Sequence, residues 1–153
     1  MADFFHQILF LNHIPVASIG TLGIKRNNII KKTNLTSLDI ISLHKNLTNL
    51  KKSNIDNVIV EASSHGLDQG RLDGINFKAG VFTNFSQDHL DYHKTMNKYL
   101  EAKKLLFSKL IKKNKFLIKD KKLKVFPVLK KIANRKKINI KLIKENKIIR
   151  EKI

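Results

Sequence analysis

Two short apolar segments that each run directly into a polar cluster place the strongest constraint on the fold of this 153-residue chain. Residues 57–60 precede a cluster that contains Glu61, Ser63, Ser64 and His65, and residues 79–82 precede one that contains Asn84, Asp88, His89, Asp91 and His93. Short apolar runs bounded by polar residues are typical of buried strands. Ligands of open α/β sheets bind beyond the carboxyl ends of the strands, so both clusters lie where a binding site is expected. An acidic residue that follows a strand, as Glu61 does, is also suited to hold the Mg²⁺ of a nucleotide.

The hydrophobic pattern predicts strands that alternate with helices along the chain. It indicates helices at residues 2–11, 95–110 and 128–133, and one that begins at Thr36 or Ser37 and ends at about residue 50. It indicates strands at residues 16–21, 57–60, 79–82, 116–118 and 138–142. Residues 25–35 are polar and are predicted to form turns. The alternation predicts an α/β fold with three layers, in which helices cover a mostly parallel sheet. The length is typical of one domain.

Charge is unevenly distributed along the chain. Residues 1–102 contain eleven Lys and Arg against nine Asp and Glu, whereas residues 103–153 contain twenty against three. A basic segment of this kind can bind nucleic acid through phosphate contacts. It has few aromatic residues for base stacking and no arginine-rich run, and lysine is abundant throughout the chain. We therefore expect no specific nucleic-acid partner, with weak attraction to polyanions at low salt.

The sequence also excludes several classes of protein. It contains no cysteine, so disulfides and thiolate metal sites are absent. The longest apolar stretch, residues 8–24, is interrupted by polar residues, glycines and a proline and is too short to span a bilayer. The first residues lack the basic segment of a signal peptide. We expect a cytoplasmic protein without a membrane partner; its oligomeric state is not indicated.

Three motifs in the second third of the chain resemble the Mur ligases. The sequence reads E-A-S-S-H-G-L-D-Q-G-R from Glu61, V-F-T-N-F-S-Q-D-H-L-D-Y-H from Val81 and Y-L-E-A-K-K-L-L-F from Tyr99, in the order and at the spacing of the central domain of the E-type enzymes. I-G-T-L-G at 19–23 and N-L-T-S at 34–37 extend the match, which is dense over residues 14–107. The resemblance implies the fold of the central, ATP-binding domain. It also implies the reaction of these enzymes, the ATP-dependent addition of the third amino acid to UDP-N-acetylmuramoyl-L-alanyl-D-glutamate in peptidoglycan synthesis.

The resemblance assigns catalytic and nucleotide-binding roles to individual residues. It makes Glu61, His89 and a carbamylated Lys103 catalytic groups that bind Mg²⁺, and it places Asn84 and Asp88 near ATP. Carbamylation converts the lysine cation into an anion, which requires a neutral amine. Taken without the resemblance, Lys103 is an ordinary solvated lysine of a helix end. The spacing of His89 four residues before the next histidine would suit zinc, but no third ligand lies at a recognisable spacing.

A second group of residues is implied to bind the muramoyl-peptide substrate. Ser63, Gln69 and Arg71 match substrate-contact positions of the family, and the arginine fork suits a carboxylate or a phosphate. Thr36 matches a further contact position. The residues on either side of it differ from the Thr-Thr-Pro of the family, because Leu35 replaces the first threonine and Ser37 replaces the proline.

One motif of the family is missing from the sequence. The chain contains no Gly-Lys-Thr or Gly-Lys-Ser, and hence no glycine-rich phosphate loop of the family's G-T-N-G-K-T kind. The resemblance therefore implies a central domain truncated at its first nucleotide-binding turn. It would occupy residues 1–153, with 108–153 as its lysine-rich distal part, and would be inactive alone. UDP-muramoyl-dipeptide and an amino acid are the implied partners. The alternatives are the related folylpolyglutamate or cyanophycin ligases, or a non-catalytic remnant that binds polyanions through its basic part.

Overall fold

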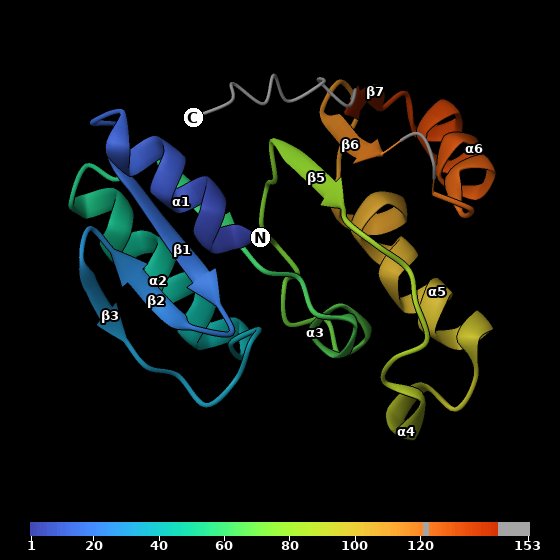
Figure 1. Ribbon diagram of the computed structural model, residues 1–153, viewed down its shortest axis with the longest axis horizontal. Helices are drawn as coiled ribbons and strands as arrows, with labels where there is room; N and C mark the ends of the chain where they lie inside the picture. Colours follow the sequence, from blue (N-terminus) through green and yellow to red (C-terminus); the bar gives the residue numbers. More distant parts are fainter. Residues whose placement is uncertain (121–122, 144–153) are drawn as a thin grey trace, which may run out of the picture. The chain divides into compact units, whose positions relative to one another are not determined.

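The computed structural model of the protein describes residues 1–120 and 123–143, and the helices and strands given below lie within these ranges. They form two compact units, which are described separately (Figure 1). The first unit contains residues 1–75 and 89–105, and the second contains residues 76–88 together with the described residues from 106 onward. No helix in the described ranges is long and apolar enough to cross a membrane.

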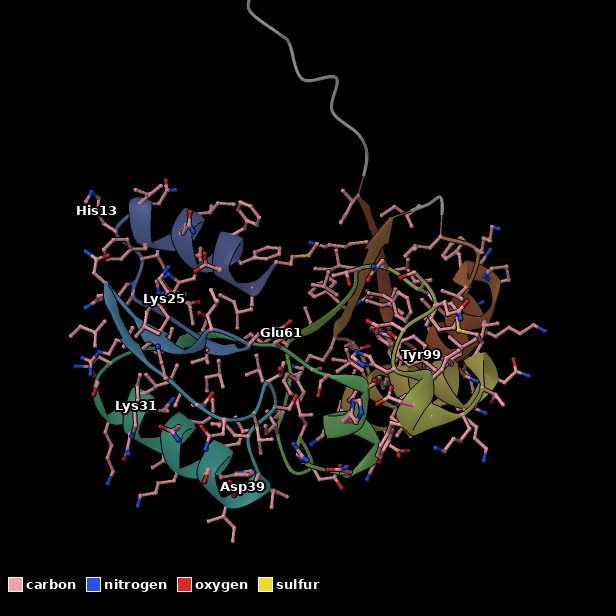
Figure 2. The ribbon with its side chains drawn as sticks, turned by 60° about the horizontal axis from the view of Figure 1, so that its bottom comes forward. His13, Lys25, Lys31, Asp39, Glu61 and Tyr99 are labelled. Atoms are coloured by element: carbon pink, nitrogen blue, oxygen red, sulfur yellow. The ribbon has the colours of Figure 1, made fainter. Side chains whose placement is uncertain are left out.

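A four-stranded sheet forms the centre of the first unit, in the order β3-β2-β1-β4. Its strands are β1 (Val16–Gly20), β2 (Gly23–Arg26), β3 (Ile29–Lys31) and β4 (Asn57–Val60). β1 is buried along its whole length and pairs in parallel with β4. Two helices, α1 (Ala2–Leu11) and α2 (Ile40–Lys52), cover opposite faces of this sheet (Figure 2). The parallel β1–β4 pair is the part of the sheet that leads into the first polar cluster.

The segment at residues 25–35, which the sequence predicts to form turns, instead completes two antiparallel strands. β2 pairs with β1, β3 pairs with β2, and Asn27 and Asn28 form the tight turn between β2 and β3. Asn27 has a φ of 52°, in the left-handed region that asparagine tolerates better than most residues. β3 is exposed at every position. The prediction was wrong because residues 26–31 are all exposed, so this part of the hairpin lacks the alternation of apolar and polar residues by which strands are recognised.

Helix α2 begins later than predicted. Asp39 caps it by accepting a hydrogen bond from the Ser42 N–H at 2.9 Å, whereas Thr36 and Ser37, the predicted caps, lie in the preceding loop. Asp and Ser are comparable N-cap residues, so the sequence alone does not decide between these positions. The two earlier hydroxyl groups are therefore available for other contacts.

Three short helices complete the first unit. They are α3 (Ser64–Asp68), α4 (Leu90–His93) and α5 (Met96–Leu105), and both α3 and α4 pack on α5. Tyr99 and Ala102 are the buried residues of α5. The predicted helix at 95–110 is not uniform, because residues Leu106–Leu110 form a π-helical turn, η1, that belongs to the second unit.

The second unit is built on a parallel three-stranded sheet in the order β5-β6-β7. Its elements are β5 (Ala79–Phe82), β6 (Phe116–Asp120), β7 (Asn139–Ile143), η1 and the helix α6 (Phe126–Lys136). The core residues include Phe107, Ile111, Leu117, Leu129 and Ala133, all of which are fully buried. The strands predicted at residues 116–118 and 138–142 are confirmed, and they pair with each other in parallel. The helix predicted at 128–133 is longer at both ends and has Pro127 in its first turn, where a missing N–H costs no hydrogen bond.

The predicted α/β class with parallel strand pairing is confirmed. The β1–β4, β5–β6 and β6–β7 pairs are all parallel, and only the β1–β2–β3 hairpins are antiparallel. The hydrogen-bonded strands form two separate sheets within the described residues. In each sheet a polar segment follows the carboxyl end of a parallel strand, and these two segments carry the predicted site residues other than Thr36 and Lys103.

Candidate functional site

The carboxylate of Glu61 is held at the carboxyl end of β4 by the end of β1. The Glu61 N–H donates to the Ile19 carbonyl at 2.8 Å, which continues the β1–β4 ladder by one residue. Its side-chain Oε2 accepts hydrogen bonds from the Thr21 N–H at 2.9 Å and from the Thr21 hydroxyl at 3.0 Å. A Cβ at Gly20 would lie 2.4 Å from the same oxygen, so glycine is required for this approach. The Glu61 side chain is exposed (Figure 2), so its orientation is fixed while it stays accessible to a ligand.

Ser37 connects the loop before α2 to the polar cluster after β4. It is 1% exposed, and its Oγ donates to the Glu61 carbonyl and accepts from the Ser63 N–H, both at 3.0 Å. The Ser63 hydroxyl lies 2.9 Å from Ser37 Oγ and, as the N-cap of α3, accepts from the Gly66 N–H at 3.0 Å. A hydroxyl has one hydrogen, and Ser37 uses it for Glu61, so Ser63 is the donor in the serine pair. All hydrogen-bonding capacity of Ser37 is therefore used within the protein.

Arg71 and Gln69 form a second branch of this network. Arg71 Nη1 donates to the Ser37 carbonyl at 3.0 Å, and its Nη2 donates to Gln69 Oε1. Gln69 Nε2 donates to the Tyr92 hydroxyl at 3.3 Å, which in turn donates to Asp68 Oδ2 at 2.9 Å. The guanidinium is thus held in one orientation by two acceptors, with further N–H groups left to bind a ligand.

Thr36 joins the network from the side of Glu61. Its hydroxyl lies 3.3 Å from the hydroxyl of Thr21, which donates to Glu61. One continuous set of hydrogen bonds therefore links Glu61 with the four residues for which the sequence predicts substrate contacts, namely Thr36, Ser63, Gln69 and Arg71.

Aromatic and imidazole rings pack together where α3, α4 and α5 meet; they belong to His65, His89, Tyr92, His93 and Tyr99. His65 is the central ring, with centroids 5.0 Å from His89 and 4.2 Å from Tyr92. His93 is 4% exposed, and its Nε2 has no hydrogen-bond partner within the described ranges. Burial lowers the pKa of His93 and the neighbouring His65 lowers it further, whereas Asp68 raises it. The neutral form of the His93 ring is therefore favoured.

Lys103 and His89, two of the three predicted Mg²⁺ ligands, contact the same ring of this cluster. Lys103 Nζ lies 4.9 Å from the centre of the Tyr99 ring, and the His89 centroid lies 5.9 Å from it in an edge-on arrangement. Tyr99 and Lys103 are four residues apart on α5 and so share one face of the helix. His89 caps α4 with a φ of 55°, a left-handed conformation of the kind that is often kept at functional sites.

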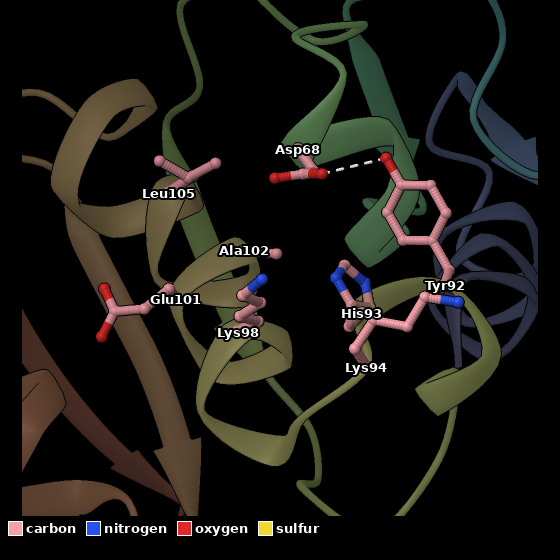
Figure 3. Close-up of a pocket in the computed structure, with 8 residues that line it drawn as sticks. All are labelled: Asp68, Tyr92, His93, Lys94, Lys98, Glu101, Ala102 and Leu105. Atoms are coloured by element: carbon pink, nitrogen blue, oxygen red, sulfur yellow. Dashed lines mark hydrogen bonds between the residues drawn. The ribbon is translucent and has the colours of Figure 1, made fainter.

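A cavity of about 510 Å³ opens beside the ring cluster (Figure 3). It is lined by Asp68, Tyr92, His93, Lys94, Lys98, Glu101, Ala102 and Leu105. The hydrogen bond from Tyr92 to Asp68 forms part of its wall and connects it to Gln69. None of the predicted Mg²⁺ ligands lines this cavity.

The predicted nucleotide-binding residues lie in the second unit. Asn84 and Asp88 belong to the segment that follows β5, and both are exposed. The Thr83 hydroxyl donates to Asn84 Oδ1 at 3.3 Å. The two side chains therefore follow the carboxyl end of a parallel strand, where α/β sheets bind ligands.

Comparison with known proteins decides the family. Residues 1–152 match the family described as the Mur ligase middle domain. The chain belongs to this family.

Relatives of this Mur ligase domain include UDP-N-acetylmuramoyl-L-alanyl-D-glutamate–2,6-diaminopimelate ligases of two bacteria. The protein of Brucella melitensis biotype 1 is 43% identical over 113 residues, which cover 74% of this chain and 23% of the relative. The protein of Wigglesworthia glossinidia brevipalpis is 44% identical over 110 residues, 72% of this chain and 22% of the relative. A solved structure of a ligase with the same name aligns with a TM-score of 0.79 at 30% identity, over 91% of this chain and 28% of that one. The chain thus spans about a quarter of the length of these proteins.

The side chains of this Mur ligase domain offer part of a Mg²⁺ site. Mg²⁺ prefers oxygen ligands, and Glu61 presents an exposed carboxylate whose Oε1 accepts no hydrogen bond from the described residues. No group of three or more His, Cys, Asp or Glu side chains within residues 1–120 and 123–143 is placed to hold a metal ion. An unmodified Lys103 would repel the ion, whereas its carbamate would add anionic oxygens. Glu61 therefore supplies one oxygen ligand that suits Mg²⁺, and a carbamate at Lys103 would supply further ones.

Three residues on which the site geometry depends are not among the predicted site residues. Thr21 orients Glu61, Ser37 joins the two branches of the network, and Tyr99 contacts both Lys103 and His89. The position of Thr21 at the carboxyl end of a predicted strand was a usable signal. Tyr99 could have been found from its spacing of four residues from Lys103. For Ser37 the only signal was that it replaces a proline of the family.

Proposed function

We propose that this chain provides the metal- and substrate-binding groups of an ATP-dependent ligase that joins an amino acid to UDP-N-acetylmuramoyl-L-alanyl-D-glutamate in the cytoplasm. The observation that carries the proposal is the single hydrogen-bonded network from Thr36 through Glu61 to Arg71. The names of the matched relatives add 2,6-diaminopimelate as the candidate amino acid. ATP and Mg²⁺ are the proposed cofactors.

The role of Arg71 follows from its fixed guanidinium. Two of its nitrogens donate within the protein, to Ser37 and Gln69, which leaves N–H groups for a carboxylate or phosphate of the substrate. Gln69 is itself held by Tyr92. Both side chains are therefore oriented before substrate arrives, which lowers the entropic cost of placing the substrate carboxylate.

The roles of Glu61 and Lys103 are electrostatic. A bound Mg²⁺ would neutralise charge on the transferring phosphoryl group. Glu61, fixed by Thr21, and the carbamate of Lys103 are the groups that we propose to hold it, together with His89. Carbamate formation joins the neutral Lys103 amine to CO₂ with release of one proton. Asn84 and Asp88, which follow β5, are proposed to contact the nucleotide.

The 153 residues by themselves are expected not to hydrolyse ATP. They contain no Gly-Lys-Thr or Gly-Lys-Ser sequence, and the phosphate loop supplies backbone N–H groups and a lysine that neutralise the ATP phosphates. Phosphate release from ATP in the presence of UDP-muramoyl-dipeptide and 2,6-diaminopimelate tests this expectation. Turnover comparable to that of a full-length ligase would contradict it.

A chimera tests the ligase function directly. The 113 matched residues of the Brucella melitensis relative would be replaced by those of this chain, and ligation would be measured as product formation. We expect an active chimera that loses at least about a hundredfold in kcat with Lys103→Arg, because an electrostatic group of the transition state is removed. Lys104→Arg, the matched control, should keep its activity. A Lys103→Arg chimera as active as its parent would contradict the proposed role.

Substrate binding provides an independent test. Calorimetric titration of the chimera with UDP-muramoyl-dipeptide should show roughly tenfold weaker binding for Arg71→Lys. The single ammonium group of lysine cannot replace a planar guanidinium that donates to Ser37 and Gln69 and also to the substrate. Arg26→Lys, in the exposed part of β2, is the control and should bind as the parent does. Equal affinities of the Arg71→Lys chimera and its parent would remove Arg71 from the proposed substrate contacts.

A further inference from the structure

Each of the three parallel strands in the second unit is preceded by lysine. Lys78 directly precedes β5, Lys115 directly precedes β6, and Lys137 lies two residues before β7. Backbone hydrogen bonds hold these positions side by side. The Phe116 N–H donates to the Lys78 carbonyl at 3.2 Å, and the Asn139 N–H donates to the Lys115 carbonyl at 2.9 Å. Because neighbouring strands lie about 4.8 Å apart, the three lysines form a row along the amino-terminal edge of the sheet.

Further cations lie in the segment before β6 and at the end of α6, which precedes β7. Lys112 and Lys113 are exposed and precede β6, and Arg135 is exposed in the last turn of α6. The Asn114 N–H donates to the Lys137 carbonyl at 3.0 Å, which fixes the segment before β6 against the end of α6. We call this surface the lysine edge; it comprises Lys78, Lys112, Lys113, Lys115, Arg135 and Lys137.

The acidic residues described in the second unit lie away from the lysine edge. The described acidic residues of the second unit are Asp88, which follows β5, and Asp120, the last residue of β6, so both lie on the carboxyl side of the strands. Within the described ranges, no side chain of the lysine edge forms an ion pair. Among the described residues of the second unit, the amino ends of the strands therefore carry cations and no carboxylate.

The lysine edge is separate from the ligand-binding edge of the same sheet. In parallel α/β sheets, substrates and nucleotides bind at the carboxyl ends of the strands, where Asn84 and Asp88 lie. Cations at the amino ends of the strands cannot serve that edge. The proposed ligase function therefore gives no role to the lysine edge. The positive charge of this edge suits an anionic ligand other than the substrates of the ligase.

We propose that the lysine edge binds the phosphate backbone of nucleic acid without sequence preference. A row of closely spaced cations matches a polymer of regularly spaced phosphates, and binding gains from the release of condensed counterions. Lysine is a flexible point charge that neutralises phosphates without reading bases, so no sequence preference is expected. An anionic membrane is the less suitable partner, because inserted apolar side chains strengthen binding to a membrane surface. The exposed large hydrophobic residues described in this unit, Leu142 and Ile143, lie at the carboxyl end of β7.

The test compares two triple variants that lose the same charge. Lys78→Gln/Lys113→Gln/Lys137→Gln removes one exposed cation from beside each strand, whereas Lys124→Gln/Lys130→Gln/Lys131→Gln removes three exposed cations from the segment before α6 and from its middle. Fluorescence anisotropy of a labelled single-stranded oligonucleotide of about 20 nucleotides measures binding to the 153-residue chain over a range of salt concentrations. Thermal melting of each variant checks that it folds, which Gln at exposed positions should not prevent.

The expected result is a site-specific loss of affinity. The lysine-edge variant should bind roughly 10- to 100-fold more weakly at about 0.1 M salt, and the slope of log K against log salt should fall by about 2, as for three lost phosphate contacts on a single strand. The control variant should change affinity less than about threefold. Equal losses in the two variants would overturn the proposal in favour of diffuse attraction. It would also be overturned if the unmodified chain failed to bind the oligonucleotide, or if it bound phosphatidylserine vesicles more tightly than the oligonucleotide.

Discussion

The ammonium nitrogen of Lys103 lies 4.9 Å from the centre of the Tyr99 ring. A cation in this position is attracted by the negative face of the ring. The attraction is lost when the lysine becomes a carbamate, which is an anion. Carbamylation therefore has to be compensated by another favourable contact, and a bound Mg²⁺ would supply it. The modification is thus expected to depend on metal.

We predict that Lys103 is carbamylated in the presence of bicarbonate and Mg²⁺. Incubation with ¹³C-labelled bicarbonate should produce one carbamate signal in the ¹³C NMR spectrum, and chelation of Mg²⁺ should weaken it. Lys103→Arg should abolish the signal. Lys104→Arg should retain it, because Lys104 is already engaged in an ion pair with Glu101 at 2.6 Å. A signal that survives Lys103→Arg would assign the modification to a different lysine.

We predict that Gly20→Ala destabilises the first unit and displaces the Glu61 carboxylate. The new Cβ would lie 2.4 Å from Glu61 Oε2 and 2.9 Å from Glu61 Cβ, well inside van der Waals contact. Such overpacking typically costs about 1–3 kcal/mol of unfolding free energy. Chemical denaturation measures the loss, and adding Glu61→Gly in the same chain should recover most of it. Strictly additive effects of the two substitutions would show that the residues do not contact each other.

We predict that Ser37→Ala weakens the link between the loop before α2 and the cluster after β4. The change removes the buried hydroxyl that donates to the Glu61 carbonyl and accepts from Ser63. Leaving these buried partners unpaired should cost about 1–3 kcal/mol of unfolding free energy. Ser86→Ala, at an exposed position, is the matched control and should be neutral. Equal melting temperatures for the two variants would show that Ser37 does not connect the network.

The sequence predicted the elements that have a clear apolar period and missed those that depend on distant contacts. Residues 2–11 form the predicted helix, and residues 57–60 and 79–82 form the predicted strands. The π-helical turn was missed because it depends on tertiary packing. There the Ile111 N–H donates to the Leu106 carbonyl five residues back, and the Phe107 ring lies so close to Gly80 that a Cβ would be 2.7 Å from it.

In the candidate site, too, the sequence predicted residues that belong to a local motif and missed those that act through distant contacts. The motifs predicted Glu61 and Arg71 as site residues, because their chemical types and positions are recognisable in the chain. The residues that hold them are 34 and 40 positions away, Ser37 for Arg71 and Thr21 for Glu61. Hydrogen bonds between residues so far apart leave no periodic signal, so only the folded chain reveals them.

We predict that the stability of the protein falls as the pH drops below about 6.5, the ordinary pKa of histidine. His6 of α1 is fully buried, and neither of its ring nitrogens has a hydrogen-bond partner in the described part of the chain. Burial lowers the pKa of His6 and Lys25 on β2 lowers it further, whereas Asp3, which pairs with Lys25 at 2.6 Å, raises it. The folded state therefore binds this proton less readily than the unfolded state does.

The sign of the effect follows from this difference. The contribution of neutral His6 is fully present above the unfolded pKa and is lost as the pH falls from there towards the lower pKa of the folded state. Within that window the unfolding free energy should decrease by up to about 1.4 kcal/mol per pH unit for each such group. His93, whose pKa is also lowered, adds to the same slope. His6→Leu places an apolar side chain at this buried position of α1. It should reduce the slope of unfolding free energy against pH, measured by urea denaturation across this range, whereas His13→Gln at an exposed position should not. Identical slopes for the unmodified chain and His6→Leu would mean that the folded state binds this proton as readily as the unfolded state, with His6 still in its site. The nearby Lys25, and the lack of a hydrogen-bond partner for the ring nitrogens in the described part of the chain, argue against that outcome.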